Sequence, residues 1–211
     1  MARKEEAYNY LKEAIITNQL RPGEPISELS LSGQLNMSRS PIREALRMLE
    51  QEGLVVNYPV RGSFVAAMTP YDVEDVFQLR IMLELWALER SMTRFTPEDM
   101  DELERLFQDS EEEGSWEKRH EADRRFHAMI VEKAGSPRLL HFVKMLNLQS
   151  ERIRRISAKN SMRMKRSYEE HMEILQHIRN QNLEAAKETL KKHLQAVANA
   201  AVEVASIDQN V

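Results

Sequence analysis

One segment, residues 38–54, constrains the fold of this chain more than any other part of the sequence. Pro41 suits the first turn of a helix, where its missing N–H is not needed, and Ser40 before it is a good N-terminal cap. Apolar residues follow at helical spacing. The segment therefore predicts a short amphipathic helix whose apolar face is formed by Ala45, Leu46, Met48 and Leu49.

Arginines recur every four residues in the same segment, at Arg39, Arg43 and Arg47, and line one exposed edge of the helix or its entry. Arginine can read guanine through two hydrogen bonds in the major groove, while serine hydroxyls and helix N-terminal N–H groups hold phosphates. The pattern indicates a helix that inserts into DNA. The alternative is an ordinary surface helix with a solvated basic edge.

The flanking sequence favours the DNA-binding interpretation, because its signals add up to a winged helix-turn-helix. Turn residues and short β-type runs surround the arginine-bearing helix. The predicted elements are, in order, a helix carrying Tyr8, Leu11, Ile15 and Ile16, a turn at residues 20–23, a short helix within residues 26–35 capped by Ser27, a turn at residues 36–37, the arginine-bearing helix, and strands 54–56 and 63–66 joined by loop 57–62.

The ordered motifs of this half resemble those of the GntR family of bacterial repressors over residues 5–67. They are Leu20-x-Pro22-Gly23, Leu35-x-Met37-Ser38-Arg39-Ser40-Pro41-x-Arg43-Glu44-Ala45-Leu46, Leu49-x-x-Glu52-Gly53-Leu54 and Arg61-Gly62. The resemblance implies operator contacts from the helix and a wing tip in the minor groove. The chain departs from some members by having Leu29 in place of an arginine. The expected DNA-binding residues are Ser38, Arg39, Ser40, Pro41, Arg43, Arg47, Arg61 and Gly62.

The length of 211 residues allows one large or two modest domains. The expected junction is Met68-Thr69-Pro70, which divides the chain into a DNA-binding domain at residues 1–68 and a helical domain for metal or effector binding and dimerisation at residues 69–211. The net charge is −4, yet residues 1–68 hold eight basic and eight acidic side chains. A neutral domain should bind DNA weakly as one copy, so we expect a homodimer. The chain has no cysteine, no membrane-length apolar run and no signal-type segment, which predicts a cytoplasmic location.

After residue 68 the strand signals vanish, and helical periodicity predicts a bundle of six helices, so the fold class is mainly α. Thr69, Thr96 and Asn182 are expected to cap three of these helices, and Pro97 to occupy a first helical position. An acidic turn is expected at residues 111–115 and fraying from residue 206. The six helices are expected near residues 69–93, 96–110, 116–134, 137–158, 161–180 and 183–205.

Three helices of the bundle each turn a histidine toward the core, and one of them adds a carboxylate. Asp123 and His127 are one turn apart, and His171 and His193 lie on the apolar stripes of two later helices. A single histidine of this kind is more often a satisfied core residue, but unpaired buried polar groups each cost about 1–3 kcal/mol, which a shared ion would remove. Nitrogen and oxygen donors suit Zn²⁺, Ni²⁺ or Mn²⁺. The remaining histidines are interpreted as surface or helix-end residues, namely His120, His141 and His177.

This half also resembles the FCD ligand-binding domain of the FadR subfamily, over about residues 70–205. The matching motifs are Arg80-x-x-Leu83-Glu84, Asp123-x-x-Phe126-His127, and His171 and His193. Six helices would place the chain in the VanR-like branch. The resemblance implies one divalent metal per chain, with a small carboxylate completing its coordination shell.

An anionic effector near such a metal would need cations or amide donors. Arg80 lies on the inner face of its helix, and Asn147 and Arg154 share an unexpectedly polar stripe with Val143 and Ser150. We expect Arg80, Asn147 and Arg154 to contact the effector. The alternative is that Arg80 pairs with an acid of the bundle, while the amide and the serine face solvent.

These features predict an effector-responsive transcriptional regulator, in particular a repressor that binds a pseudo-palindromic double-stranded operator as a dimer. One alternative is a regulator whose metal is purely structural. A second is a metalloenzyme, but the sequence offers no nucleophile or second acid–base pair near the ligands, and an enzyme would not explain the arginines. The prediction is therefore a protein without enzymatic activity.

Overall fold

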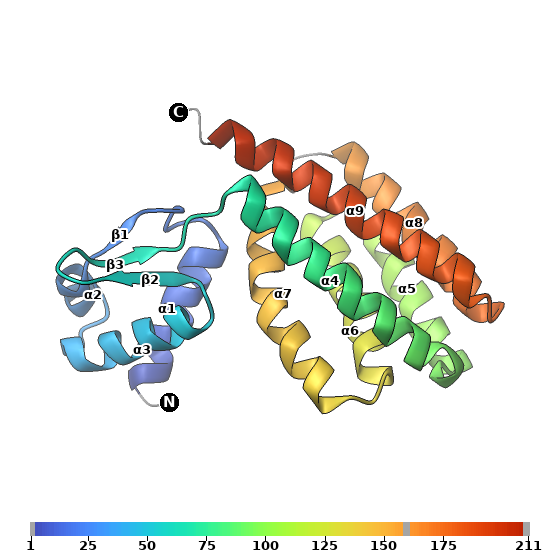
Figure 1. Ribbon diagram of the computed structural model, residues 1–211, viewed down its shortest axis with the longest axis horizontal. Helices are drawn as coiled ribbons and strands as arrows, with labels where there is room; N and C mark the ends of the chain where they lie inside the picture. Colours follow the sequence, from blue (N-terminus) through green and yellow to red (C-terminus); the bar gives the residue numbers. More distant parts are fainter. Residues whose placement is uncertain (1–2, 158–160, 209–211) are drawn as a thin grey trace.

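The structure is a computed structural model that describes residues 3–157 and 161–208, and its two halves are distinct in Figure 1. The N-terminal half is the expected winged helix-turn-helix. It contains three helices, a short first strand and the β-hairpin of the wing. Its elements are α1 (Arg3–Ile16), β1 (Pro25–Ile26), α2 (Glu28–Gln34), α3 (Arg39–Gln51), β2 (Val55–Tyr58) and β3 (Gly62–Val65).

The sheet is antiparallel with strand order β1-β3-β2, and Phe64 in β3 pairs with both Pro25 and Val56. The strand β1 was not predicted, because a segment of two residues carries no periodic signal. Ile26 belongs to this strand and not to the following helix, which begins at Glu28 with Ser27 as its cap. The wing strands also lie closer to their loop than expected, so only residues 59–61 connect them.

The predicted start of α3 was wrong by two residues. Ser38, and not Ser40, is the N-cap, with extended backbone angles, although its side chain makes no capping hydrogen bond. Arg39 and Ser40 already have helical geometry, and Pro41 is the third helical residue. Proline is tolerated there because the first-turn N–H groups have no intrahelical acceptor in any case. Arg39 is therefore a first-turn residue and not part of the entry loop.

The C-terminal half has the six α-helices expected from the sequence, with one short 3₁₀ turn, in the part of the chain that the structure describes. The helix break was expected at Asn160–Ser161; Asn160 lies outside the described residues, and Ser161 is the first residue of α8. The helices are α4 (Pro70–Ser91), η1 (Met92–Arg94), α5 (Pro97–Glu113), α6 (Trp116–Lys133), α7 (Pro137–Ser157), α8 (Ser161–Arg179) and α9 (Leu183–Asp208).

The three helix caps predicted for this half are confirmed. Thr69 and Thr96 each accept a hydrogen bond from the backbone three residues later and form capping boxes, and the Asn182 side chain accepts from the Ala185 N–H. The acidic turn at residues 111–115 was wrong, because α5 continues through Glu113. Glutamate favours helix, and Gly114 at φ 66° provides the left-handed residue that ends it. Similarly, α9 continues to Asp208, beyond the predicted end at residue 205.

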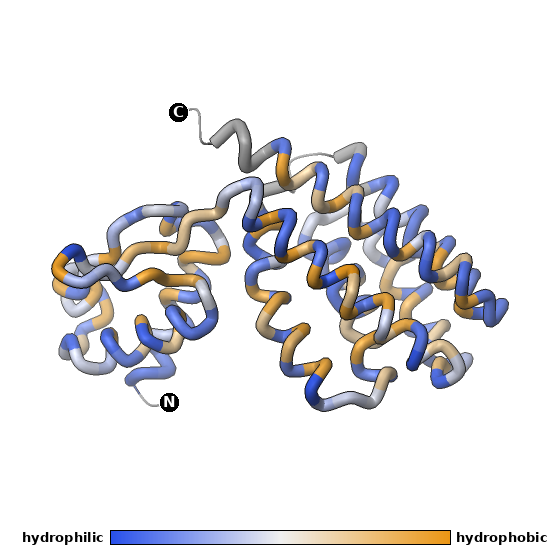
Figure 2. The backbone as a smooth tube through the Cα atoms, viewed as in Figure 1, coloured by the Kyte–Doolittle hydropathy of each residue, from blue (hydrophilic) through white to orange (hydrophobic). Residues whose placement is uncertain are grey.

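Apolar side chains form a separate core in each half, and Figure 2 shows hydrophobic residues on the inward sides of the helices. In the helical half α4 packs against α9, α6 and α7, while α5 packs against α6 and α8. The helix nearest the winged half is α7, which contacts α1 (Figure 1). Fully buried members of the two cores include Leu11, Ile15, Ile42 and Leu54 in the first and Leu103, Phe126, Ile130 and Leu190 in the second.

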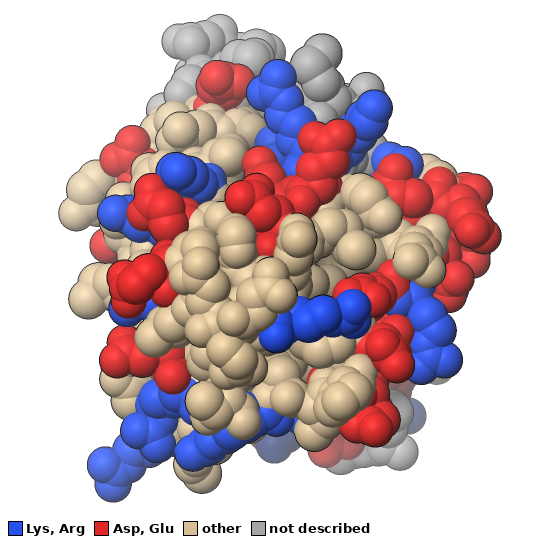
Figure 3. All heavy atoms as spheres, turned by 90° about the vertical axis from the view of Figure 1, so that its right-hand side faces the viewer, with Lys and Arg blue, Asp and Glu red and all other residues tan. Residues whose placement is uncertain are grey.

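The end of the helical half that faces away from the winged half carries interspersed acidic and basic side chains (Figure 3). A surface of mixed charge does not form the continuous basic stripe that nucleic acids prefer. This agrees with a DNA-binding surface in the other half. Among the described residues, no helix combines the length and the apolar character needed to cross a membrane.

Candidate metal centre and DNA-binding surface

Four side chains from three helices converge in the centre of the helical half. Asp123 and His127 come from α6, His171 from α8 and His193 from α9, and the three histidines are buried. Asp123 Oδ1 lies 3.6 Å from Nε2 of His127, 3.4 Å from that of His171 and 3.9 Å from that of His193. One ligand atom from each residue lies within 4.8 Å of the others. The structure thus brings the whole predicted ligand set together.

A second layer of acceptors fixes the orientation of each imidazole ring. Every Nδ1 atom lies within hydrogen-bond distance of an oxygen, so each ring can donate from Nδ1 and present Nε2 as a lone pair. Such outer contacts are typical of metal-ligating histidines. The pairs are His127 with Glu84 Oε2 at 2.5 Å, His171 with the Ser167 carbonyl at 2.6 Å and His193 with Glu170 Oε2 at 2.7 Å.

The three Nε2 atoms are buried and make no hydrogen bond within the described part of the chain. A buried polar atom without a partner costs about 1–3 kcal/mol, and here three of them face the same carboxylate oxygen. A divalent cation fits this arrangement, because it would satisfy all four atoms at once. Imidazole and carboxylate donors suit zinc, nickel or manganese.

The local electrostatics keep the ligands in the forms that bind a cation. Burial lowers the pKa of His171 and of His193 well below the usual histidine value, so both rings are neutral. Burial by itself would raise the pKa of Asp123, but the Arg154 guanidinium pairs with Oδ2, and the pKa falls well below its usual range. The Asp123 carboxylate is therefore charged, with its other oxygen turned toward the histidines.

Arg80 is buried on α4, and its Nε donates to Glu84, whose second oxygen holds His127. Burial raises the pKa of Glu84, but Arg80 and His127 outweigh it and bring the pKa to about 2. Arg80 thus pairs with an acid of the bundle, Glu84, as the alternative interpretation expected. The guanidinium still lines a cavity, and its buried NH1 makes no hydrogen bond to the described residues.

That cavity has a volume of about 390 Å³ and lies between α4, α6 and α7, next to His127. All three residues predicted to contact the effector line this cavity, namely Arg80, Asn147 and Arg154. Ser150 is buried, and its hydroxyl has no hydrogen-bond partner in the described structure. The polar stripe of α7 therefore faces this cavity, not bulk solvent.

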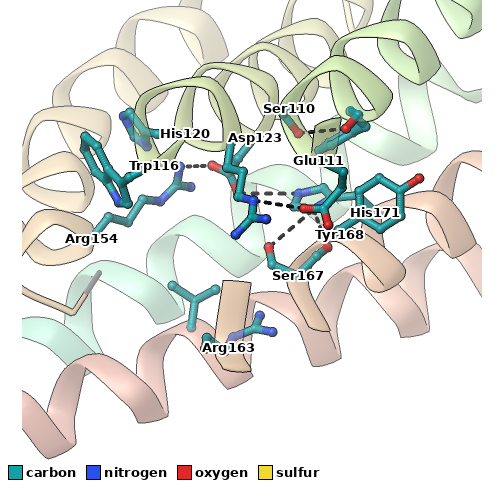
Figure 4. A pocket seen from close by; sticks show the side chains of 13 residues that line it. Ser110, Glu111, Trp116, His120, Asp123, Arg154, Arg163, Ser167, Tyr168 and His171 are labelled. Carbon is teal, nitrogen blue, oxygen red and sulfur yellow. Dashed lines mark hydrogen bonds and ion pairs between the residues drawn. The ribbon is translucent and has the colours of Figure 1, made fainter. Parts of the chain in front are cut away.

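A second cavity, of about 110 Å³, borders the cluster at Asp123 and His171 (Figure 4). Its walls include Trp116 and His120, which stack with ring centroids 4.9 Å apart, and Arg154 lines it as well as the first cavity. No pattern in the sequence predicted this space, and His120 was expected at the surface or at a helix end.

The position of His120 needs correction. Its side chain is only 13% exposed, and Nε2 lies 2.6 Å from Glu151 Oε2 on α7. A signal was present in the sequence, because Trp116, His120, Asp123 and His127 follow the i, i+4, i+7, i+11 pattern of one helix face. Among the other two histidines, His141 is exposed and His177 lies in the last turn of α8, as expected.

The predicted DNA-binding residues of α3 form an exposed surface at its N-terminal end and along one edge. Ser38, Arg39, Ser40, Arg43 and Arg47 are exposed, and Pro41 is partly buried beneath them. Arg43 Nε lies 2.8 Å from Glu28 Oε2 of α2, an exposed ion pair that holds the guanidinium beside the helix. Leu29, the departure from the family pattern, is 67% exposed on α2.

The wing tip consists of residues 59–61 between β2 and β3. The Arg61 guanidinium lies 5.9 Å from the Tyr58 ring centroid and 6.0 Å from that of Phe64, so the aromatic rings of both strands support it. Gly62 has φ 91°, a conformation that requires glycine. Val60 has φ 72° and is fully exposed, which is unusual for a β-branched residue.

One helix links the cavities to the winged half. On α7, Gln149 donates to the Glu52 carbonyl at 3.0 Å, and Arg152 donates to the Ala66 carbonyl at 2.7 Å. Glu52 is the C-cap of α3, and Ala66 follows β3. The same helix carries Arg154, which pairs with Asp123, so α7 connects the Asp/His cluster with the C-terminal end of α3 and the end of β3.

Comparison with known proteins identifies both halves. The model of the bacterial regulatory proteins of the gntR family matches residues 3–65, and the model of the FCD domain matches residues 75–196. The HTH-type transcriptional regulator YdhC of Bacillus subtilis is 29% identical over 190 residues, which cover 88% of this chain and 85% of that protein. The Nta operon transcriptional regulator of Aminobacter aminovorans is 30% identical over 161 residues, covering 75% of each chain.

Solved structures show the same fold. A GntR-type transcriptional regulator from Rhodococcus sp. RHA1 superposes with a TM-score of 0.78 at 22% sequence identity, over 98% of this chain and 99% of that one. The winged helix-turn-helix, the six-helix half and the sequence matches agree with one another. The chain belongs to the gntR family of bacterial regulatory proteins and, within it, to the regulators that carry an FCD domain.

Proposed function

We propose that this protein is a transcriptional repressor that releases its operator when a small carboxylate binds beside a divalent metal ion. The observation that carries the proposal is the set of three buried Nε2 atoms, without hydrogen-bond partners among the described residues, that face Asp123 Oδ1. Asp123, His127, His171 and His193 would hold one zinc, nickel or manganese ion per chain. When bound, the ion would supply positive charge and up to two open coordination positions for an anionic ligand.

The cavity next to His127 supports a carboxylate as the effector. Arg80 and Arg154 bring two guanidinium groups to its walls, and Asn147 and Ser150 offer amide and hydroxyl donors. Arg80 keeps its position because Glu84 holds it from the side of the metal ligands. A hydrophilic acid could therefore reach the metal with one carboxylate and hydrogen-bond to α7 with its remaining groups.

Helix α7 is the proposed link between the effector and DNA. Ser150 and Arg154 face the cavity, whereas Gln149 and Arg152 bond to the winged half from the other side of the same helix. A ligand that shifts or rotates α7 would move the end of α3 and the base of the wing. Effector binding would then change the population of domain arrangements that fit an operator, with a proposed domain boundary at residues 68–69.

The proposed assembly is a homodimer, because a winged half with equal numbers of acidic and basic residues gives one copy little affinity for DNA. Large apolar side chains are exposed on two helices that pack together, α4 and α7. We propose that a second copy covers them. They are Tyr71, Leu79, Met82 and Trp86 on α4 and Phe142 and Met145 on α7.

The metal content of protein purified without chelators tests the site. Wild type should contain one divalent ion per chain, and His171→Ala should contain almost none. His177→Ala is the matched control, since it removes a histidine from the same helix outside the cluster. Glu84→Gln, which removes the charge that orients His127, should lower metal affinity by about 10–100-fold without removing a ligand. Equal metal content in wild type and His171→Ala would mean that these are ordinary core histidines.

A further inference from the structure

The tip of the wing presents two apolar residues to solvent. Pro59 and Val60 directly follow β2, and both are exposed. Val60 is 107% exposed, more than any other large apolar side chain of the described residues. A valine side chain that stays in water adds no burial of apolar surface to the stability of the fold. Packing within the protein therefore does not explain an apolar tip.

The backbone conformation of Val60 makes the choice of valine more unusual. Its φ is 72°, and it follows a proline, whose ring holds φ near −65°. This sequence of angles is that of a type II turn, in which glycine or asparagine normally takes the second central position. A β-branched residue with positive φ is strained, and such strain is concentrated at functional sites. The strain indicates that the side chain of Val60 serves a purpose that glycine or asparagine would not.

The structure around the tip holds it in a fixed position beside α3. Below the tip, Tyr58 and Phe64 pack edge to face with ring centroids 5.6 Å apart, and together they support the Arg61 guanidinium. At the base of the wing, Asn57 Nδ2 donates to Glu50 Oε2 of α3 at 2.7 Å, and β2 packs beside α3 (Figure 1). The wing tip and the proposed DNA-binding residues of α3 would therefore meet a duplex together.

The dimensions of DNA decide which groove the tip would meet. The major groove admits an α-helix, whereas the minor groove is only about 6 Å wide and admits a narrow tip. With α3 in a major groove, the neighbouring groove within reach of the wing is a minor groove. Minor-groove proteins that combine arginine with apolar wedges partly unstack a base step and bend the duplex.

We propose that Pro59 and Val60 form an apolar wedge that opens one base step of the operator from the minor groove, with Arg61 beside it. The inference rests on DNA binding by the winged half and not on the metal or the effector. The cost of unstacking depends on the step and is lowest at flexible pyrimidine–purine steps such as TA and CA/TG. The wedge would therefore select a flexible step without any hydrogen bond to a base edge.

A scan with 2-aminopurine tests the wedge, because the fluorescence of this base rises when it is unstacked. The base is placed at successive positions of a selected operator, and full-length protein is added without effector. Wild type should raise the fluorescence at one step next to the segment that α3 contacts. Val60→Ile keeps a β-branched apolar side chain and should do the same, whereas Val60→Asn should give no rise. Val56→Asn is the matched control, since Val56 is an exposed valine of β2 away from the tip.

A mismatched base pair at the same step provides a second measurement. A mismatch removes part of the cost of unstacking. It should tighten operator binding by wild type by about ten-fold, or about 1.4 kcal/mol, as measured by fluorescence anisotropy. Val60→Asn should bind the matched and mismatched duplexes equally. Circular dichroism should show that Val60→Asn is folded, because the change relieves backbone strain.

The inference would be overturned by an equal rise in fluorescence with wild type and Val60→Asn, by no rise at any position, or by an equal effect of the mismatch on both proteins. A changed sedimentation coefficient of DNA-free Val60→Asn, with unstacking unaltered, would also overturn it and make the tip a contact between copies of the chain. Metal-stripped protein should unstack the step as metal-loaded protein does. Failure of the proposed function would thus leave this result intact.

Discussion

Replacing Arg152 by methionine should make the protein more stable while it weakens the link between its two halves. Arg152 is 1% exposed at the contact between α7 and the winged half, and one of its nitrogens donates to the Ala66 carbonyl. Its Nε and NH1 make no hydrogen bond to any described residue. Burial lowers the pKa of this arginine to about 10, although the Asp72 carboxylate acts in the opposite direction.

The magnitude follows from this pKa. The fall from the ordinary arginine pKa to about 10 corresponds to a cost of about 3 kcal/mol for keeping the charge in the folded protein. The unfolded chain binds this proton more tightly, so the cost is present in full at pH values below about 10 and is lost as the pH rises above that value. The hydrogen bond to Ala66 offsets about 1.5–3 kcal/mol of it. Ala66 is partly exposed, so water can replace the lost donor, and the net gain for Arg152→Met should be up to about 1.5 kcal/mol.

Urea unfolding of metal-stripped wild type and Arg152→Met at pH 7 measures this difference. Arg138→Met is the control, since it makes the same substitution at an exposed position of the same helix and should change the free energy of unfolding by no more than about 0.5 kcal/mol. The variant should also bind operator DNA but respond less to the effector. If Arg152→Met is less stable than wild type, the contacts of Arg152 outweigh its desolvation and the reasoning fails.

Three further predictions concern other parts of the molecule. Arg39→Ala and Arg43→Ala should each weaken operator binding by about 1–3 kcal/mol without changing the melting temperature, as measured by fluorescence anisotropy; unchanged binding in both would mean that α3 does not read the operator. The free energy of unfolding of metal-stripped protein should fall as the pH drops below about 6.5, because the unfolded chain protonates His171 and His193 whereas the folded protein keeps them neutral; a flat profile between pH 5 and 7 would contradict this. Val60→Asn should raise the stability by about 1 kcal/mol, because asparagine adopts a positive φ more easily than valine, and a lower melting temperature would contradict this.

The parts of the fold predicted from the sequence are those with local signals. Thr69 and Thr96 predicted the starts of two helices, because a capping residue acts over only three positions. The spacing of Asp123 and His127 predicted that both lie on one inward face of a helix. The strand β1 was missed because its two residues are held by pairing with β3, which is distant in the sequence. Local signals also misplaced the cap of α3, since several residues there can serve as caps.

In the candidate site, too, features with a local sequence signal were predicted and features set by contacts between helices were not. The spacing of the histidines indicated the cluster, but nothing local showed that Glu84 would hold His127 or that Arg154 would pair with Asp123, because these contacts join different helices. The smaller cavity forms where five helices leave a gap, so it follows from packing and not from any one segment. The contact of Arg152 with Ala66 is likewise a property of the assembled chain.

The most direct test of the proposed function is release of a selected operator by small carboxylates, measured by fluorescence anisotropy. Metal-loaded wild type should bind the operator tightly and release it at a saturating concentration of one carboxylate. His171→Ala should still bind but not respond, because α3 lies in the other half, and metal-stripped wild type should behave in the same way. His177→Ala should respond like wild type. Release of equal extent from wild type, His171→Ala and metal-stripped protein would contradict the account, and metal binding without release by any carboxylate would leave the ion a purely structural role.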